Sequence, residues 1–221
     1  MTPRGRVVTR GPALVLRPAV PGDADVAAAL ILEPVPSLID LLHSEEVAFQ
    51  VARASFLAER SVHSYRFATV AMEAGHPIGL VVAVPGTEFP RLRQWTGLVM
   101  LWAGLARARA LIRAGGVVDR LTPPVPADSV YVSSLAVAPD RRGSGAGTAL
   151  IAHVEAEARR RGRARLALDV NRDNARGRAF YQRLGFLETG RRIASSDERR
   201  RVATTGFLRL EKRLAVTAAA A

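Results

Sequence analysis

The 221-residue sequence predicts an α/β fold, in which short apolar strands alternate with helices. An apolar strand over 130–137 runs through a glycine-rich turn directly into an alanine-rich helix, which makes a strand–turn–helix unit. A pair of strands precedes this unit, and two more strands end the chain. A chain of this length is expected to bury one substantial core, although two small domains are compatible with it.

The N-terminal part alternates a strand, helices and a strand pair. Asp23 and Asp25 favour the start of a helix, because acidic side chains stabilise a helix N-terminus. Pro34 and Pro36 separate this helix from the next one, which is expected from its periodicity. The expected elements are a strand over 14–18, helices over 21–32 and 38–59, and strands over 66–72 and 78–84 joined by a turn at 73–76.

A long segment, residues 89–127, precedes the strand–turn–helix unit and is predicted to be a helical insert. Residues 95–106 are nearly all apolar, but the run is too short and too closely flanked by arginine to span a membrane. The insert either caps the core or forms a homodimer face, or it is a lid over a binding site; a peripheral membrane contact is a further alternative. The apolar residues at helical spacing are Leu98, Leu101, Trp102, Leu105 and Ile112.

The remaining elements complete one domain over residues 12–215, with flexible tails at 1–11 and 216–221. A strand over 165–170 follows the unit, and a helix begins after Asn174. Strands over 185–193 and 205–214 are expected to form a C-terminal hairpin.

Composition narrows the classes of function. The net charge of +12 comes almost wholly from arginine, since Lys212 is the only lysine, and a basic surface attracts anions. The aromatic content of 5% leaves few side chains on which bases could stack, which disfavours nucleic-acid binding. The absence of cysteine excludes disulfides, thiolate metal sites and a covalent cysteine intermediate. The apolar run 13–16 is too short for a signal sequence, so we expect a cytoplasmic protein.

The turn after residue 137 is predicted to bind a phosphate. Its glycines remove Cβ atoms that would hold a phosphate away, and a helix N-terminus presents free N–H groups and a partial positive charge. Arg141 and Arg142 add full charges. No lysine adjoins the turn, which excludes a P-loop, and the glycine spacing does not fit the dinucleotide fingerprint. Asp169 lies near the distance of a ribose-binding acid, which leaves that alternative open.

The turn fits a different pattern, Arg-x-x-Gly-x-Gly, in the stretch Arg142-Gly143-Ser144-Gly145-Ala146-Gly147. This stretch resembles motif A of the GNAT superfamily of acyl-CoA N-acyltransferases. Residues 174–186 resemble motif B of the same superfamily, because Asn174 is followed seven residues later by Tyr181 and then by a Gly-Phe pair. The alanine usual at the third position after the asparagine is Gly177 here.

The resemblance implies a GNAT-like mixed sheet that splays open after the motif A strand, with acetyl-CoA bound in the gap. Main-chain groups of that strand would pair with pantetheine, and Asn174 would hold the pantetheine arm or the pyrophosphate. Tyr181 is implied as the general acid that protonates the departing thiolate, since a phenol with a pKa of about 10 is protonated at neutral pH. The implied cofactor-binding residues are Leu135, Ala136, Val137, Arg142, Gly143, Ser144, Gly145, Ala146, Gly147, Thr148, Asn174 and Tyr181.

The implied activity is acetyl transfer from acetyl-CoA to a primary amine by direct attack in a ternary complex, without a metal. The acceptor is a small amine or amino-acid-like metabolite, or a protein amine. Many relatives carry an acidic general base on the motif A strand, where this chain has Ser133 and Ser134. Asp128, Glu33 or a water chain are the alternative bases, and none of the histidines is singled out. A non-catalytic acyl-CoA sensor is the alternative function.

Overall fold

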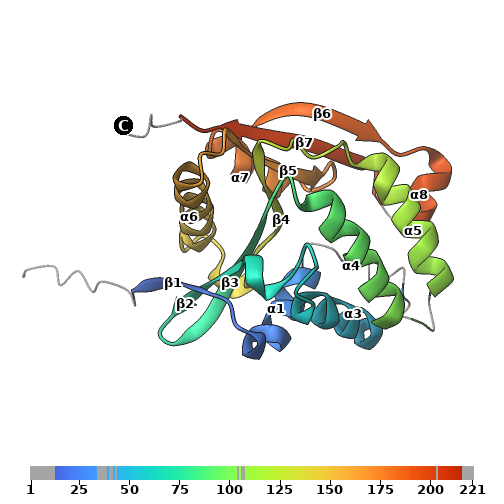
Figure 1. Cartoon of the computed structure of the whole chain (residues 1–221), viewed down its shortest axis with the longest axis horizontal. Helices are drawn as coiled ribbons and strands as arrows, with labels where there is room; N and C mark the ends of the chain where they lie inside the picture. Colours follow the sequence, from blue (N-terminus) through green and yellow to red (C-terminus); the bar gives the residue numbers. More distant parts are fainter. Residues whose placement is uncertain are drawn as a thin grey trace, which may run out of the picture.

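Seven strands form one mixed sheet in the part of the chain that the structure describes, in the order β1-β2-β3-β4-β5-β7-β6 (Figure 1). This computed structural model describes residues 13–33, 39, 42, 44–103, 105, 108–202 and 204–215. The predicted tails and parts of the helix predicted over 38–59 lie outside these ranges. The strands are β1 (Leu14–Pro18), β2 (Ala68–Glu73), β3 (His76–Pro85), β4 (Ser129–Val137), β5 (Arg165–Asn171), β6 (Leu187–Ile193) and β7 (Gly206–Arg213).

The sheet opens between β4 and β5. These two strands run parallel and pair only from Ser129–Arg165 to Tyr131–Ala167. Just beyond that point, a register shift against β3 leaves Ser133 as an extra residue in β4, and such a bulge bends a strand. β4 therefore separates from β5 after Tyr131. The splayed, mixed sheet expected from the sequence is confirmed.

Helices cover both faces of the sheet (Figure 1). On one face, Leu150 and Ile151 of α6 pack with Leu166 of β5 and with the apolar side of α7. The other face carries α1, α3 and α4, in clusters that include Phe56 and Phe89. The helices are α1 (Ala24–Leu32), α3 (Glu45–Leu57), α4 (Phe89–Ala103), α5 (Ala108–Leu121), α6 (Ala146–Arg160), α7 (Ala175–Arg183) and α8 (Ser196–Val202).

Two predicted elements need correction. β6 and β7 pair as expected, but helix α8 connects them where a simple hairpin was predicted. Ser195 and Glu198 form a capping box for α8: Ser195 Oγ accepts from the Glu198 N–H at 3.3 Å, and the Glu198 carboxylate accepts from the Ser195 N–H at 3.0 Å. β2 begins at Ala68, later than expected, because Ser64 caps a 3-10 turn over Tyr65–Phe67.

The insert folds into two helices, α4 and α5, and its first helix begins at Phe89, earlier than the apolar run indicated. The inner face of α4 buries Phe89, Leu92 and Thr96 against the sheet. α5 packs Val117 and Leu121 against α8. The insert therefore joins the α3 side of the molecule to the α8 side (Figure 1).

Candidate functional site

The glycine-rich turn after β4 takes a left-handed course into α6. Gly143 has φ +87° and Gly145, the N-cap of α6, has φ +91°, conformations that side chains rarely adopt. A Cβ on either glycine would meet no atom within 4 Å. Glycine is required here by the backbone, and the space in front of the turn is open.

The same turn presents unused N–H groups. Within the turn, the Ser144 N–H donates to the Arg141 carbonyl at 3.3 Å, and the Ala146 N–H donates to Ser144 Oγ at 3.4 Å. Four other N–H groups of this segment donate to no described residue. They belong to Gly143, Gly145, Gly147 and Thr148. Free N–H groups at a helix N-terminus form an anion-binding site, so the turn can hold a phosphate.

Packing also requires a glycine at position 147. A Cβ at this position would come within 3.3 Å of the Phe180 ring, so the missing side chain lets α7 approach the first turn of α6. This contact brings the anion-binding turn close to the helix that carries Tyr181.

The two arginines of the turn already have carboxylate partners. Arg142 forms an ion pair with Glu33, which follows α1, and the two side chains are 29% and 32% exposed. Arg141 lies 3.5 Å from Glu73 and 3.6 Å from Asp140. A phosphate bound at the turn would therefore compete with Glu33 for Arg142.

Leu135, Ala136 and Val137 form the end of β4 beside the opening. Their other edge pairs with β3, through Val81, Leu80 and Gly79 respectively. Ala136 is buried on the α1 face, while Leu135 and Val137 pack on the α6 face. From Val132 onward, β4 has no partner on the β5 side among the described residues. This free edge can accept an extended chain as an added strand.

Asn174 caps helix α7. Its Oδ1 accepts from the Gly177 N–H at 2.7 Å, which leaves the side-chain NH₂ as a donor at the exposed end of the helix. A Cβ at position 177 would lie 2.8 Å from Asn174 Nδ2. The unusual glycine in motif B therefore makes room for this cap.

Tyr181 lies on α7 with its ring against two phenylalanines. The ring centroids of Phe180 and Phe186 are 5.2 Å and 5.5 Å away, both in edge-to-face arrangements. The residue is half-buried, and no described residue forms a hydrogen bond with its hydroxyl. Burial raises the pKa of the Tyr181 phenol, because it disfavours the charged phenolate. The hydroxyl is thus protonated and available as a donor.

The general bases considered from the sequence have other partners in the structure. Ser133 Oγ donates to the Val62 carbonyl at 2.5 Å, so the hydroxyl is committed to the backbone. Asp128 pairs with Arg165 at 2.7 Å, and Glu33 pairs with Arg142. Both carboxylates are therefore already engaged by arginine side chains.

Asp169 is not a ribose-binding group. Its carboxylate is 4% exposed and holds the Arg209 guanidinium in two hydrogen bonds of 2.8 Å. The buried Tyr131 hydroxyl donates to the same carboxylate at 2.9 Å. The dinucleotide alternative is therefore wrong, because this acid ties β4, β5 and β7 together beneath the insert.

His63 is the titratable residue that the sequence did not single out. It follows Val62 in the loop between α3 and β2, and its Nδ1 is buried with no hydrogen-bond partner among the described residues. Burial lowers the pKa of His63 to about 4. The ring is therefore neutral near pH 7 and a weak proton acceptor. Only the folded chain brings this loop beside β4, so sequence spacing gave no signal for it.

The described ranges contain no cluster of three or more His, Cys, Asp or Glu side chains suited to a metal ion. They also contain no helix that is long and apolar enough to cross a membrane.

An open anion-binding turn lies beside a splayed pair of parallel strands, which is the arrangement that the resemblance of motifs A and B implies. A family model described as the Acetyltransferase (GNAT) family matches residues 36–186. The chain belongs to this family, which confirms the resemblance drawn from motifs A and B.

Individual relatives agree with this assignment. The chain is 46% identical over 56 residues to the 5-NmdU N-acetyltransferase of Pseudomonas phage PaMx11, a match that spans 25% of this chain and 38% of the phage protein. Its fold is similar to an N-acetyltransferase from Staphylococcus aureus Mu50, with a TM-score of 0.64, 15% identity, and coverage of 90% of this chain and 100% of that one. It is also similar to the PaiA N-acetyltransferase from Thermoplasma acidophilum in complex with coenzyme A, with a TM-score of 0.55, 15% identity, and coverage of 91% and 99%. These two likenesses establish the fold alone.

Proposed function

We propose that this chain transfers an acetyl group from acetyl-CoA to a primary amine, by direct attack of the amine on the thioester in a ternary complex. The proposal rests on how close the anion-binding turn, Tyr181 and the free edge of β4 lie to one another. The free N–H groups of the turn and the unpartnered hydroxyl of Tyr181 belong to helices that touch through Gly147 and Phe180, beside the free edge of β4. A phosphate anchor, a strand edge and a proton donor thus lie around one opening.

Each group has a role in this proposal. The N-terminus of α6 and Arg142, released from Glu33, hold the pyrophosphate. The β5-facing edge of Leu135–Val137 pairs with pantetheine, and one N–H of this edge polarises the thioester carbonyl. The Asn174 NH₂ donates to the pantetheine arm.

The chemical step balances without a covalent enzyme intermediate. The amine nitrogen forms a bond to the carbonyl carbon, the carbon–sulfur bond breaks, and the departing sulfur takes the proton of the Tyr181 hydroxyl. The acceptor ammonium loses one proton to solvent water before it attacks. The nitrogen loses a second proton to water as the amide forms, and the Tyr181 phenolate takes a proton back from water. This route follows from the ion-paired state of Asp128 and Glu33 and from the hydrogen bond that Ser133 donates.

The acceptor is proposed to be a small amine or amino-acid-like metabolite, or a protein amine. The name of the phage relative, 5-NmdU N-acetyltransferase, adds 5-NmdU as a third candidate acceptor. The net charge of +12 favours an anionic acceptor over a polycationic one.

Acceptor-dependent release of CoA thiol from acetyl-CoA tests the proposal. The panel holds simple amines, amino acids, polyamines, aminoglycosides, short peptides and 5-NmdU. The chain has no cysteine, so the thiol reagent meets no protein background. Turnover with one class would identify the acceptor. A flat panel with acetyl-CoA still bound would refute a small-molecule acceptor, and failure of acetyl-CoA to bind would refute the proposal as a whole.

A further inference from the structure

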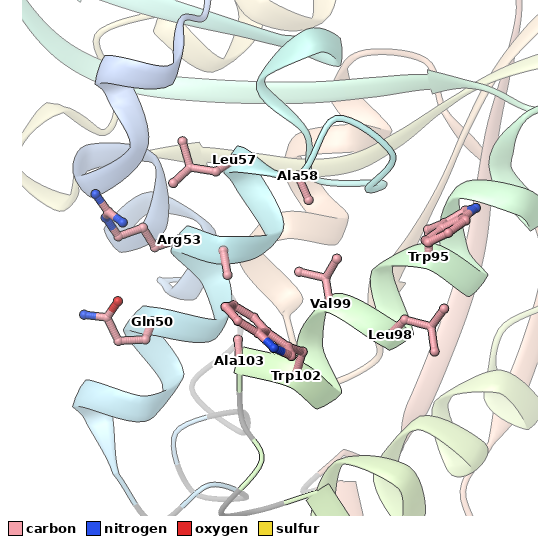
Figure 2. Close-up of a pocket in the computed structure, with 10 residues that line it drawn as sticks. Gln50, Arg53, Leu57, Ala58, Trp95, Leu98, Val99, Trp102 and Ala103 are labelled. Carbon is pink, nitrogen blue, oxygen red and sulfur yellow. The ribbon is translucent and has the colours of Figure 1, made fainter.

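The turn over residues 61–64, between α3 and β2, is fixed against the insert. Ala58, just before the turn, and Trp95 line one groove between α3 and α4 (Figure 2). The Val62 N–H donates to Thr96 Oγ1 at 2.9 Å, and Thr96 is buried. The chain therefore passes from the end of α3 directly onto the middle of α4.

The same turn also lies on β4, at the place where the sheet opens. Ser133 Oγ donates to the Val62 carbonyl at 2.5 Å, and Ser133 comes two residues after Tyr131, the last β4 residue that pairs with β5. Val62 shares a cluster with Tyr131 and with Leu92 of α4, on the face of the sheet opposite α6. The turn therefore borders the opening from that face.

His63 is the polar side chain of this turn that has no hydrogen-bond partner among the described residues. The hydroxyls of Ser61 and Ser64 are buried and accept from the N–H groups of His63 and Arg66, at 3.1 Å and 3.3 Å. The His63 ring is half-buried: its Nδ1 is fully buried without a hydrogen bond, whereas its Nε2 keeps accessible surface. Nε2 is therefore the ring nitrogen that a bound molecule can reach.

Burial also decides which nitrogen of His63 carries the ring proton. A neutral imidazole has one N–H donor and one acceptor nitrogen. A buried N–H without an acceptor is rarer in folded proteins than a buried acceptor without a donor, so we assign the proton to Nε2. The reachable atom is thus a donor, and a donor selects for an oxygen atom on the molecule that binds there.

We propose that the Nε2–H of His63 donates to a carbonyl or carboxylate oxygen beside the acceptor amine, so that amino-acid-like acceptors are preferred to plain alkyl amines. This inference rests on the proposed function. Helices α6 and α7, which would hold acetyl-CoA, lie on one face of the sheet, so the amine reaches the thioester from the other face, where the turn over 61–64 lies. An oxygen held by His63 would orient the neighbouring nitrogen toward the opening.

Three acceptors of similar size test the proposal on the full chain: alanine, alaninamide and isopropylamine. All three carry the amine on a carbon with a methyl branch, but only the first two have an oxygen beside it. The preference is the ratio of kcat/KM for an oxygen-bearing acceptor to that for isopropylamine, measured by CoA thiol release. We expect His63→Phe to lower this preference by about 3- to 10-fold, as the loss of one hydrogen bond would. Differences in amine basicity cancel, because the same acceptors are compared in both proteins.

Two variants serve as controls. His63→Gln places an amide NH₂ near the position of Nε2 and should keep most of the preference. His76→Phe makes the same change as His63→Phe at an exposed position, the first residue of β3, and should leave the preference unchanged. The melting temperature of His63→Phe should stay the same or rise, since the unpartnered Nδ1 is removed.

Nitrogen NMR of the wild-type chain tests the ring proton without any turnover. We expect the Nε2–H tautomer for His63, and an Nδ1–H tautomer would overturn the inference. Equal losses for all three acceptors, together with a lower melting temperature in His63→Phe, would show that His63 serves the fold alone. Turnover of isopropylamine but neither oxygen-bearing acceptor would refute the preference. Absence of turnover with every amine would instead refute the proposed function.

Discussion

Removal of the Tyr181 hydroxyl separates catalysis from packing. In Tyr181→Phe the ring keeps its edge-to-face contacts with Phe180 and Phe186. The hydroxyl has no hydrogen-bond partner among the described residues, so its loss leaves no orphaned group. We therefore expect the free energy of unfolding to change by no more than about 0.5 kcal/mol.

The effect on the reaction should be much larger. Without the phenol the departing thiolate takes its proton from water, and the loss of one general acid typically lowers the rate by about 10²–10⁴-fold. This factor corresponds to about 2.7–5.5 kcal/mol of transition-state free energy. Acetyl-CoA affinity should stay unchanged, because the hydroxyl acts on sulfur only as the bond breaks.

Tyr131→Phe is the matched control, since it also removes one phenol hydroxyl. The Tyr131 hydroxyl donates to the buried Asp169 carboxylate at 2.9 Å. Its removal should destabilise the fold by about 1–3 kcal/mol and leave kcat unchanged. The opposite pattern is expected for Tyr181→Phe, so the two variants distinguish a catalytic phenol from a structural one.

Initial rates of CoA thiol release, acetyl-CoA binding by calorimetry and urea unfolding are measured on both variants. A fall of less than about tenfold in kcat for Tyr181→Phe would remove it as the general acid. A loss of stability equal to that of Tyr131→Phe would show that the hydroxyl has a structural partner instead.

Three further outcomes follow from the site. The pH profile of kcat/KM should rise with an apparent pKa that moves with the pKa of the acceptor amine; a fixed value for two different amines would instead reveal an enzyme base. The folded-state pKa of His63 is about 4, below its usual value, so the folded chain binds fewer protons than the unfolded chain between about pH 6.5 and 4. Stability should therefore fall by at most about 3 kcal/mol as pH drops through this range, and urea unfolding of His63→Gln should lose that slope. Glu33→Gln should lower the KM for acetyl-CoA by about threefold, because Arg142 is then free to bind the phosphate. Arg142→Gln should raise this KM by about 3- to 10-fold, which corresponds to about 0.7–1.4 kcal/mol. Equal KM values in both variants would show that Arg142 does not leave Glu33 to bind the phosphate.

Local patterns predicted the shape of the glycine-rich turn better than the contacts that distant residues make with it. The turn and the N-terminus of α6 follow from adjacent residues, so the glycines at 143 and 145 were identified from the sequence alone. The Arg142–Glu33 pair joins residues 109 positions apart, and the Arg209–Asp169 pair joins residues 40 apart. Such contacts depend on how strands and helices come together, which periodicity and motif spacing do not encode.

The capping role of Asn174 could not be predicted from the sequence either. Motif B identified the residue, but its role as a cap depends on the space at Gly177, which only coordinates reveal. Conversely, helix α8 was missed although its Ser195-x-x-Glu198 signal is local. The strand pattern on either side favoured a hairpin, and the Ser195-x-x-Glu198 signal between the strands was not used.

The structure gives a physical reason for a serine at residue 133, near which the resemblance to the family implies an acid. Both main-chain polar groups of Val62 are hydrogen-bonded. Its N–H donates to Thr96 Oγ1 of the insert at 2.9 Å, and its carbonyl accepts from Ser133 Oγ at 2.5 Å. A carboxylate at residue 133 would face that carbonyl with no proton to donate. The contact between the insert and Val62 therefore disfavours an acid at residue 133.

Ser133→Glu tests this coupling between the insert and the proton route. The resemblance to the family implies an acid near residues 133 and 134, so an acid at 133 would restore a base if chemistry alone decided the residue. We expect instead a loss of about 1–3 kcal/mol in unfolding free energy, since the Val62 carbonyl loses its donor. The pH profile should still follow the acceptor, because the displaced loop does not present the carboxylate to the amine. Higher kcat/KM at low pH with unchanged stability would show that Ser133 is not held by the insert.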